Sequence, residues 1–132
     1  MCIFCEIIEG NIPSAKVYED DEVLAILDVS QLTKGHTLVM PKKHVENLLE
    51  CDDETLQHLI LVTKKLAKEL CDKLGAEGCN IINNTNPVAG QSVMHLHFHI
   101  IPRYGEDDAV STAFEPNHEP YDLNEILKEI NA

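Results

Sequence analysis

The most regular stretch of the chain spans residues 53–74 and reads DETLQHLILVTKKLAKELCDKL. Its apolar side chains recur three and four positions apart, which is the spacing of one buried helix face. Asp52 and Asp53 can cap the beginning of the helix, the lysines favour its C-terminal half, and Gly75 provides a stop. The sequence predicts a long helix whose buried face consists of Leu56, Leu59, Ile60, Thr63, Leu66, Ala67, Leu70 and Leu74.

Short apolar segments on both sides of this helix are typical of strands. They cover residues 17–19, 23–28, 35–40, 79–83 and 93–101. Pro41 and Pro102 are expected to end the third and fifth strands, because proline cannot donate a hydrogen bond to a sheet ladder. The strands and helices do not alternate as βαβ units, so the pattern predicts an antiparallel α+β fold.

The remaining segments complete a single domain over residues 1–132, a length that is typical of one domain. Residues 3–9 are expected to form a short helix, which the Gly10–Ser14 segment then breaks. Residues 105–120 are polar and contain two prolines, so they are expected to be a loop. A short C-terminal helix is expected to begin at Asp122.

Composition limits the classes of function. The chain carries 10 basic and 23 acidic residues, a net charge of −13, which argues against a nucleic acid partner. It has no apolar run of roughly 18 residues, so no membrane partner is expected. The chain does not begin with a basic region followed by an apolar stretch, and its cysteines number five. These features favour a reduced, cytoplasmic protein.

Histidines occupy every second position in the run His95-Leu96-His97-Phe98-His99. In a strand, the three imidazoles would share one face, while the apolar residues between them would face the core. Three interpretations are open for such a face. It can be an exposed polar surface, a metal site with His-x-His spacing, or a catalytic site. Imidazole is a good nucleophile near neutral pH and can attack phosphorus to give a covalent intermediate.

The loop before this run favours catalysis. Gly90 permits a close backbone approach, Gln91 offers an amide, and Ser92 offers a hydroxyl. Donors of this kind suit the negative charge that develops on phosphate oxygens. The loop and the histidine run together predict an enzyme that acts on a phosphate.

These motifs resemble the signature of the histidine-triad (HIT) family. The likeness rests on residues 95–103 (HLHFHIIPR), 90–93 (GQSV), 23–30 and 35–44, and it extends over roughly residues 2–105. The resemblance implies a five-stranded antiparallel sheet with one long helix, and two protomers that pair into a larger sheet as a homodimer. It also implies hydrolysis or transfer at the α-phosphate of a purine nucleotide, usually an adenosine nucleotide.

The resemblance also implies roles for individual residues. His97 matches the nucleophile that takes the nucleotidyl group, and His99 matches a phosphate ligand. His36 is expected behind the triad, where it orients an imidazole. Four further residues match binding positions for phosphate, leaving group or ribose: Asp28, Asn83, Gln91 and Ser92. The base pocket of the family corresponds to Ile3, Phe4, Ile7, Ile26, Val29 and Leu38.

Cys2-x-x-Cys5 forms half of a metal site, because tetrahedral zinc commonly takes four Cys and His ligands. The zinc-binding branch of the family pairs such a motif with the histidine after Pro-Lys-x and with the first triad histidine. The resemblance therefore implies a structural Zn²⁺ site formed by Cys2, Cys5, His44 and His95, with no metal needed for the chemistry. The alternatives are reduced, partly buried thiols and His36 in place of His44.

Two substrate classes fit this resemblance, AMP phosphoramidates and dinucleoside polyphosphates. The ending Ile101-Pro102-Arg103 resembles the dinucleoside polyphosphate side of the family and many bacterial members. A different class of function is a non-catalytic purine-nucleotide-binding module that zinc stabilises. The presence of His97, Ser92 and Asn83 favours the enzyme, because a pure binding protein does not need the nucleophile.

Overall fold

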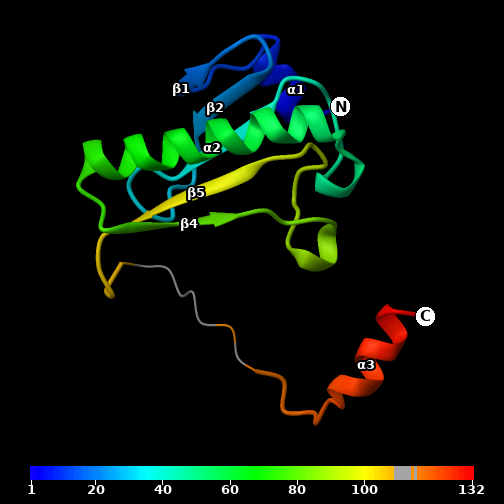
Figure 1. Ribbon diagram of the computed structural model, residues 1–132. Helices are drawn as coiled ribbons and strands as arrows, with labels where there is room; N and C mark the ends of the chain where they lie inside the picture. The colour runs from blue at the N-terminus through cyan, green and yellow to red at the C-terminus, as the bar shows by residue number, and fades with distance from the viewer. Residues whose placement is uncertain (109–113, 115) are drawn as a thin grey trace.

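The computed structural model describes residues 1–108, 114 and 116–132. Its elements follow the chain as three helices, five strands and two short 3-10 turns (Figure 1). The helices are α1 (Ile3–Ile8), α2 (Asp53–Leu74) and α3 (Leu123–Ile130), and the 3-10 turns are η1 (Leu48–Glu50) and η2 (Pro87–Ala89). The strands are β1 (Lys16–Glu19), β2 (Val23–Leu27), β3 (Thr37–Pro41), β4 (Gly78–Ile82) and β5 (Phe98–Arg103).

The five strands form one sheet in the order β1-β2-β3-β5-β4, and every neighbouring pair is antiparallel. This confirms the five-stranded antiparallel sheet with one long helix that the sequence predicts. Leu38 of β3 pairs with Ile26 on one side and His99 on the other, so these three side chains form a row on one face.

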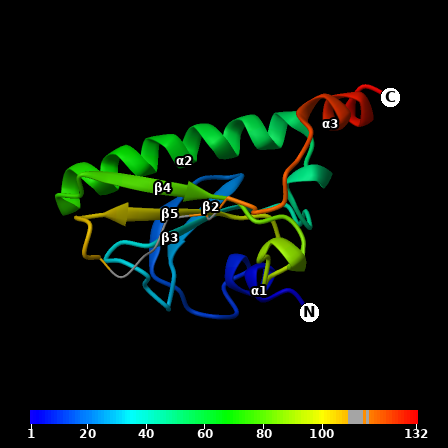
Figure 2. The same ribbon diagram turned by 90° about the horizontal axis from the view of Figure 1, so that it is seen from below.

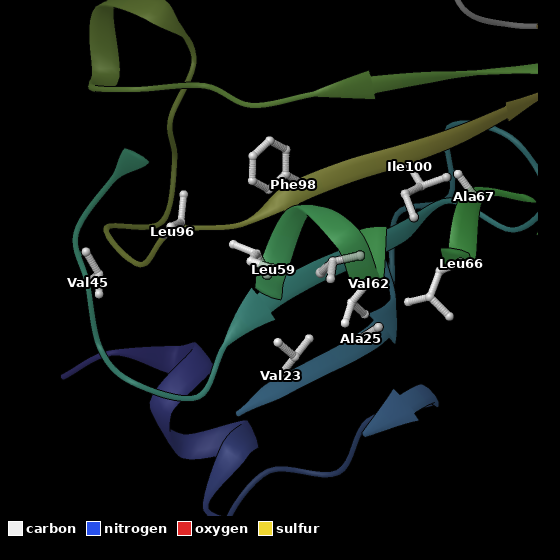
Figure 3. Packing of buried hydrophobic residues seen from close by; sticks show 11 residues of the cluster. Val23, Ala25, Val45, Leu59, Val62, Leu66, Ala67, Leu96, Phe98 and Ile100 are labelled. Atoms are coloured by element: carbon white, nitrogen blue, oxygen red, sulfur yellow. The ribbon is translucent and has the colours of Figure 1, made fainter. Parts of the chain in front are cut away.

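Helix α2 covers one face of the sheet (Figure 2). Its observed bounds, Asp53–Leu74, equal the predicted ones, because both ends are capped as expected. The Asp52 side chain accepts a hydrogen bond from the Thr55 N–H, and Gly75 adopts the left-handed conformation that ends the helix. The core beneath α2 joins Leu59, Val62 and Leu66 to strand residues such as Phe98 and Ile100 (Figure 3).

One residue of the predicted buried face of α2 lies elsewhere. Ile60 is 40% exposed, while Val62 is 5% exposed and belongs to the core. The buried face of α2 is therefore rotated slightly from the predicted one. The position of the sheet determines this rotation, and the helical period alone does not predict it.

The opposite face of the sheet carries α1 (Figure 2). Phe4 and Ile7 of this helix pack against Leu24, Leu38 and Met40 in a second apolar cluster. The cluster brings the N-terminal helix, which carries part of the Cys-x-x-Cys motif, next to strands β2 and β3. The two clusters thus give the sheet one fully covered face and one face that α1 covers in part.

The fifth strand differs from its prediction at both ends. It covers residues 98–103, not 93–101, and Pro102 lies inside it opposite Cys79. Proline is tolerated there because the pairing of β3 with β5 stops at Ile100. Residues 93–97 are irregular, since their polar groups bond to segment 41–46 and to the loop before them. The predicted strand bounds are therefore wrong, and of the three triad histidines only His99 lies in β5. The predicted alternation is kept, because Leu96, Phe98 and Ile100 pack into one core cluster, while His97 and His99 line the cavity with their rings 5.0 Å apart.

The third strand also includes its proline, because Pro41 is the last residue of β3 and pairs with Val23. The C-terminal helix α3 begins as predicted, with the Asp122 side chain accepting from Asn124 N and Glu125 N. Residues 109–113 and 115 of the predicted 105–120 loop lie outside the described residues. Among the helices that the structure describes, none is both long and apolar enough to cross a membrane.

The core beneath α2 gives a direct stability test. Leu59 is 0% exposed, whereas Leu61, two residues later in the same helix, is 63% exposed. We expect Leu59→Ala to lower the free energy of unfolding by about 2–5 kcal/mol, because the deletion leaves a cavity. Leu61→Ala is the matched control, with an expected change within about 0.5 kcal/mol. Urea denaturation measures both, and equal losses would contradict the packing of this face.

Candidate functional site

A cavity of about 580 Å³ lies on the α1 side of the sheet. Apolar side chains from α1, β2 and β3 form most of its wall, and its polar end holds Asp28, Ser92, His97 and His99. The wall includes every residue predicted for the base pocket: Ile3, Phe4, Ile7, Ile26, Val29 and Leu38. An apolar pocket with a few convergent polar groups is the usual form of a small-molecule site.

His97 is buried, and one of its two ring nitrogens is engaged by the backbone. Nδ1 donates to the carbonyl oxygen of His95 at 2.7 Å. A carbonyl oxygen can only accept, so the proton of the neutral ring is on Nδ1 and the lone pair is on Nε2. The Phe4 ring packs edge-on against the imidazole, with centroids 5.0 Å apart. This arrangement fixes both the plane and the tautomer of His97.

His99 receives a hydrogen bond from His36, behind the pocket. The Leu32 N–H donates to His36 Nδ1 at 3.3 Å, so the proton of neutral His36 is on Nε2. His36 Nε2 lies 2.9 Å from His99 Nδ1 and donates to it. His99 therefore carries its own proton on Nε2, where it is a donor at the polar end of the cavity. His36 thus contacts His99 from behind the triad, and its role in orienting that imidazole stays a prediction.

Burial holds these imidazoles in their neutral forms. It lowers the pKa of His97, against the opposing effects of the His95 carbonyl and the Asp28 carboxylate. It lowers the pKa of His99 to about 4, with further lowering by the neighbouring His97 and His36. A neutral His97 has a lone pair for attack, and a neutral His99 still has one N–H to donate.

Asp28 lies at the rim of the cavity, in the loop that connects β2 to β3. Gln31 holds this loop, because its Nε2 donates to the carbonyls of Asp28 and His36 at 2.6 and 2.7 Å. Its Oε1 accepts from the N–H of Gly35, which has a φ of +94°. This left-handed φ strongly favours glycine, and a Cβ there would also lie 2.5 Å from Leu74 Cδ1. One Asp28 oxygen accepts from Ser30 N, and the other lies 3.7 Å from His36 Nε2.

The residues from the loop before β5 take separate positions. Ser92 lines the cavity. The Asn83 amide donates to the His97 carbonyl at 3.0 Å. Gln91 is buried and is not among the residues lining the cavity, because its Nε2 donates to the carbonyls of Glu46 and Val93 at 2.6 and 3.0 Å. The Gln91 amide thus braces the loop that carries Ser92.

Cys2, Cys5, His44 and His95 meet beside α1, and one ligand atom from each lies within 4.8 Å of the others. Cys2 caps α1 with its sulfur and Cys5 lies in the first turn, so both thiols are at one end of the helix. His95 Nε2 donates to the Pro41 carbonyl at 2.8 Å, which leaves Nδ1 unprotonated and facing the cluster. All four residues thus turn a potential metal-ligand atom inward.

The distances in this cluster fit a tetrahedral metal. His95 Nδ1 lies 3.4 Å from Cys2 Sγ, 3.6 Å from Cys5 Sγ and 3.2 Å from His44 Nδ1. Tetrahedral zinc with ordinary bond lengths separates its ligand atoms by about 3.3–3.8 Å. Burial and the Cys2 thiol raise the pKa of Cys5 to about 11. The donor set and its spacing therefore fit zinc, and His44, not His36, is the histidine that joins it.

Asp28, His36 and His99 form a second group whose ligand atoms lie within 4.8 Å of one another. A metal between these side chains would have to replace the proton that His36 Nε2 shares with His99 Nδ1. It would also force the His36 proton onto Nδ1, against the N–H of Leu32. The hydrogen bonds therefore favour a chain of neutral imidazoles at this position.

One wall of the cavity was not predicted from the sequence. Residues 12–15, which connect α1 to β1, line it together with Leu27 and Gln31. Gly10 has a φ of +85° and turns the chain back over the sheet. The Gly-Asn-Ile-Pro signal predicts this turn, but the place where the returning segment comes to lie depends on tertiary packing.

Comparisons with known proteins agree with this fold and show its family. A sequence model of the HIT domain matches residues 9–106. A crystal structure of a member of the HIT family of proteins from Bacillus subtilis is 49% identical with a TM-score of 0.88, covering 98% of this chain and 94% of that chain. Adenosine 5'-monophosphoramidase hnt1 from Schizosaccharomyces pombe is 35% identical, covering 99% of this chain and 96% of that protein. A zinc-bound histidine triad family protein from Mycobacterium smegmatis is 38% identical with a TM-score of 0.79, covering 88% and 84% of the two chains.

The buried imidazoles predict a pH dependence of stability. His99 has a pKa of about 4 in the folded chain, against an ordinary value of 6.5. Between these two values the unfolded chain binds more protons, so the stability present above the upper value is lost as the pH falls toward the lower one. We expect His99→Asn to flatten this part of the curve in urea denaturation with a chelator present throughout. An equal slope in wild type and variant would contradict a neutral buried His99.

Proposed function

Because the chain belongs to the HIT family, we propose that it hydrolyses adenosine nucleotide conjugates at the α-phosphate through a nucleotidyl-histidine intermediate. The observation that carries this proposal is the tautomer of His97. Its Nδ1 proton is bound to the His95 carbonyl, so the lone pair is on Nε2, in a buried ring at the polar end of an apolar cavity. A nucleophile in this state needs no prior deprotonation.

The proposed reaction has two displacements at phosphorus. His97 Nε2 attacks the α-phosphorus, a P–N bond forms, and the bond to the leaving group breaks with its electron pair on the departing atom. Ser92 is the proposed proton donor to that atom, because it lines the same cavity as His97 and carries a hydroxyl group. Water then attacks the same phosphorus and returns a proton to the Ser92 oxygen, the P–N bond breaks, and AMP leaves while His97 regains its neutral form.

Neighbouring groups are proposed to hold the substrate in both steps. The Nε2–H of His99 donates to a non-bridging phosphate oxygen, which stabilises the charge that accumulates there. Asp28 accepts from the ribose hydroxyls at the rim, and the apolar wall takes the purine base. Asn83 and Gln91 act through the backbone that they hold, because their amides are bonded to the His97 and Glu46 carbonyls.

AMP phosphoramidates are the substrate class that we favour. The ending Ile101-Pro102-Arg103, which resembles the dinucleoside polyphosphate side of the family, is absent from the residues that line the cavity. Arg103 instead binds Asp108 and Asn80. The similarity to the monophosphoramidase hnt1 supports the phosphoramidate class.

Two further features are proposed for the assembled protein. The Cys2, Cys5, His44 and His95 cluster binds a structural Zn²⁺, since four protein ligands leave no position for reactive water. The homodimer implied by the resemblance stays a prediction. The sheet ends in β1 on one side and β4 on the other, so either strand edge can receive a strand of a second copy.

Replacement of the nucleophile tests the proposed reaction. We expect His97→Ala to lower kcat with AMP phosphoramidate by roughly a thousandfold or more, because no other group forms the covalent intermediate. Diadenosine polyphosphate is assayed in parallel, and wild type is expected to prefer the phosphoramidate. Circular dichroism and AMP binding verify that the variant is folded. A variant that keeps the wild-type rate would exclude His97, and a wild type that binds AMP but cleaves neither substrate would favour a binding module.

Metal analysis tests the zinc site. Protein purified without a metal-chelating tag is expected to contain about one zinc per chain, and Cys5→Ser is expected to lose most of it. Cys71→Ser is the matched control, because Cys71 lies at the far end of α2 and should keep full zinc content. A wild type without zinc, or equal zinc content in both variants, would contradict the assignment.

A further inference from the structure

The segment that carries the catalytic residues is not part of the sheet. Residues 91–97 hold Ser92 and His97, yet β5 begins only at Phe98. Three hydrogen bonds attach this segment to residues 41–46 instead. His95 Nε2 donates to the Pro41 carbonyl at 2.8 Å, Leu96 N to the Val45 carbonyl at 2.7 Å, and Gln91 Nε2 to the Glu46 carbonyl at 2.6 Å.

The metal cluster spans these same two segments. His44 belongs to segment 41–46, His95 belongs to segment 91–97, and their Nδ1 atoms lie 3.2 Å apart. Of the cysteines in the cluster, Cys2 caps α1 and Cys5 lies within it, and this helix also contributes Phe4 to the wall beside His97. A metal at this position would therefore join three parts of the chain that surround the nucleophile.

His95 belongs both to the metal cluster and to the hydrogen bond that fixes the tautomer of His97. Its ring presents Nδ1 to the cluster, and its backbone carbonyl accepts the Nδ1–H of His97 at 2.7 Å. The distance along the chain from metal ligand to nucleophile is two residues. Any shift of His95 therefore moves the acceptor that keeps the His97 proton on Nδ1.

We propose that metal binding by Cys2, Cys5, His44 and His95 positions the nucleophile, by holding the His95 carbonyl where it selects the reactive tautomer of His97. This inference rests on the proposed function of His97. His44 and His95 are positioning residues in it, and the metal takes no part in the chemical steps. It assigns a catalytic consequence to a site that would otherwise serve stability alone.

The physical reason lies in the atoms that surround His95 Nδ1 in the cluster. His95 Nδ1 lies 3.2 Å from His44 Nδ1 and 3.4 and 3.6 Å from the sulfurs of Cys2 and Cys5, so a metal bound among these atoms would hold the His95 ring from this side. Without the metal, the ring keeps the hydrogen bond from Nε2 to the Pro41 carbonyl but loses the coordinate bond to Nδ1, and His95 is free to shift. With the carbonyl displaced, His97 populates the other tautomer, whose proton on Nε2 blocks attack on phosphorus.

The test compares two replacements of one ligand. His44→Ala removes a ligand, whereas His44→Cys keeps four ligands of types that zinc accepts. The control is His118→Ala, which changes an exposed histidine of the C-terminal segment. Long-range proton–nitrogen NMR spectra report the His97 tautomer, and amide hydrogen exchange at Leu96 reports the contact with Val45. Kinetics with AMP phosphoramidate give kcat and KM separately.

We expect His44→Ala to show mixed His97 tautomers, faster exchange at Leu96, and a kcat lowered by about 10–100-fold with little change in KM. His44→Cys loaded with zinc and His118→Ala are expected to match wild type. If His44→Ala does not fold, wild type treated with a chelator and then returned to zinc gives the same comparison. The tautomer readout does not require turnover, so it separates this inference from the proposed reaction.

Two results would overturn the inference. One is a folded, zinc-free protein whose His97 tautomer and Leu96 exchange equal those of the zinc-loaded form. The other is a wild type that binds no zinc at all. A purely stabilising metal would give the first result together with a lower melting temperature.

Discussion

The hydrogen bond from His97 Nδ1 to the His95 carbonyl is the constraint on which the rest of the site depends. It decides which nitrogen of the imidazole is free, and a ring with the opposite tautomer would present a proton where a lone pair is needed. The bond in turn requires that His95 be held, and its Nε2 is bonded to the Pro41 carbonyl at the end of β3. His97 is therefore connected to the end of β3 by two hydrogen bonds, one to the His95 carbonyl and one from the His95 ring to the Pro41 carbonyl.

Burial sets the electrostatics of this site. The protein has a net charge of −13, and the cavity wall, as far as the described residues form it, includes neither lysine nor arginine. The phosphate of the proposed substrate would then be held by neutral donors, and we assign this role to the His99 N–H. Desolvation lowers the pKa of His97 and His99 and so favours their neutral forms. Neutral imidazoles attract a phosphate less strongly than charged ones. In exchange, the proposed nucleophile His97 keeps its lone pair and His99 keeps one N–H to donate.

Much of this arrangement could be predicted from the sequence, and the failures have local causes. The bounds of α2 followed from its period and caps, and the sheet followed from short apolar segments between turn residues. Residues 93–97 alternate as a strand does, but alternation does not reveal that Gln91 and His95 bond to segment 41–46 instead of a ladder. The hydrogen bonds of Gln91 and the wall formed by residues 12–15 depend on contacts between segments that are distant in the sequence. Such contacts cannot be predicted from the local pattern of a single sequence.

The stereochemical course at phosphorus tests the central claim most directly. The substrate is an AMP conjugate with sulfur in place of one non-bridging α-oxygen, prepared as a single stereoisomer and hydrolysed in heavy-oxygen water. Each in-line displacement inverts the phosphorus centre, so two displacements through His97 predict net retention of configuration in the product. Net inversion would mean that water attacks the substrate directly, and it would contradict the nucleotidyl-histidine intermediate.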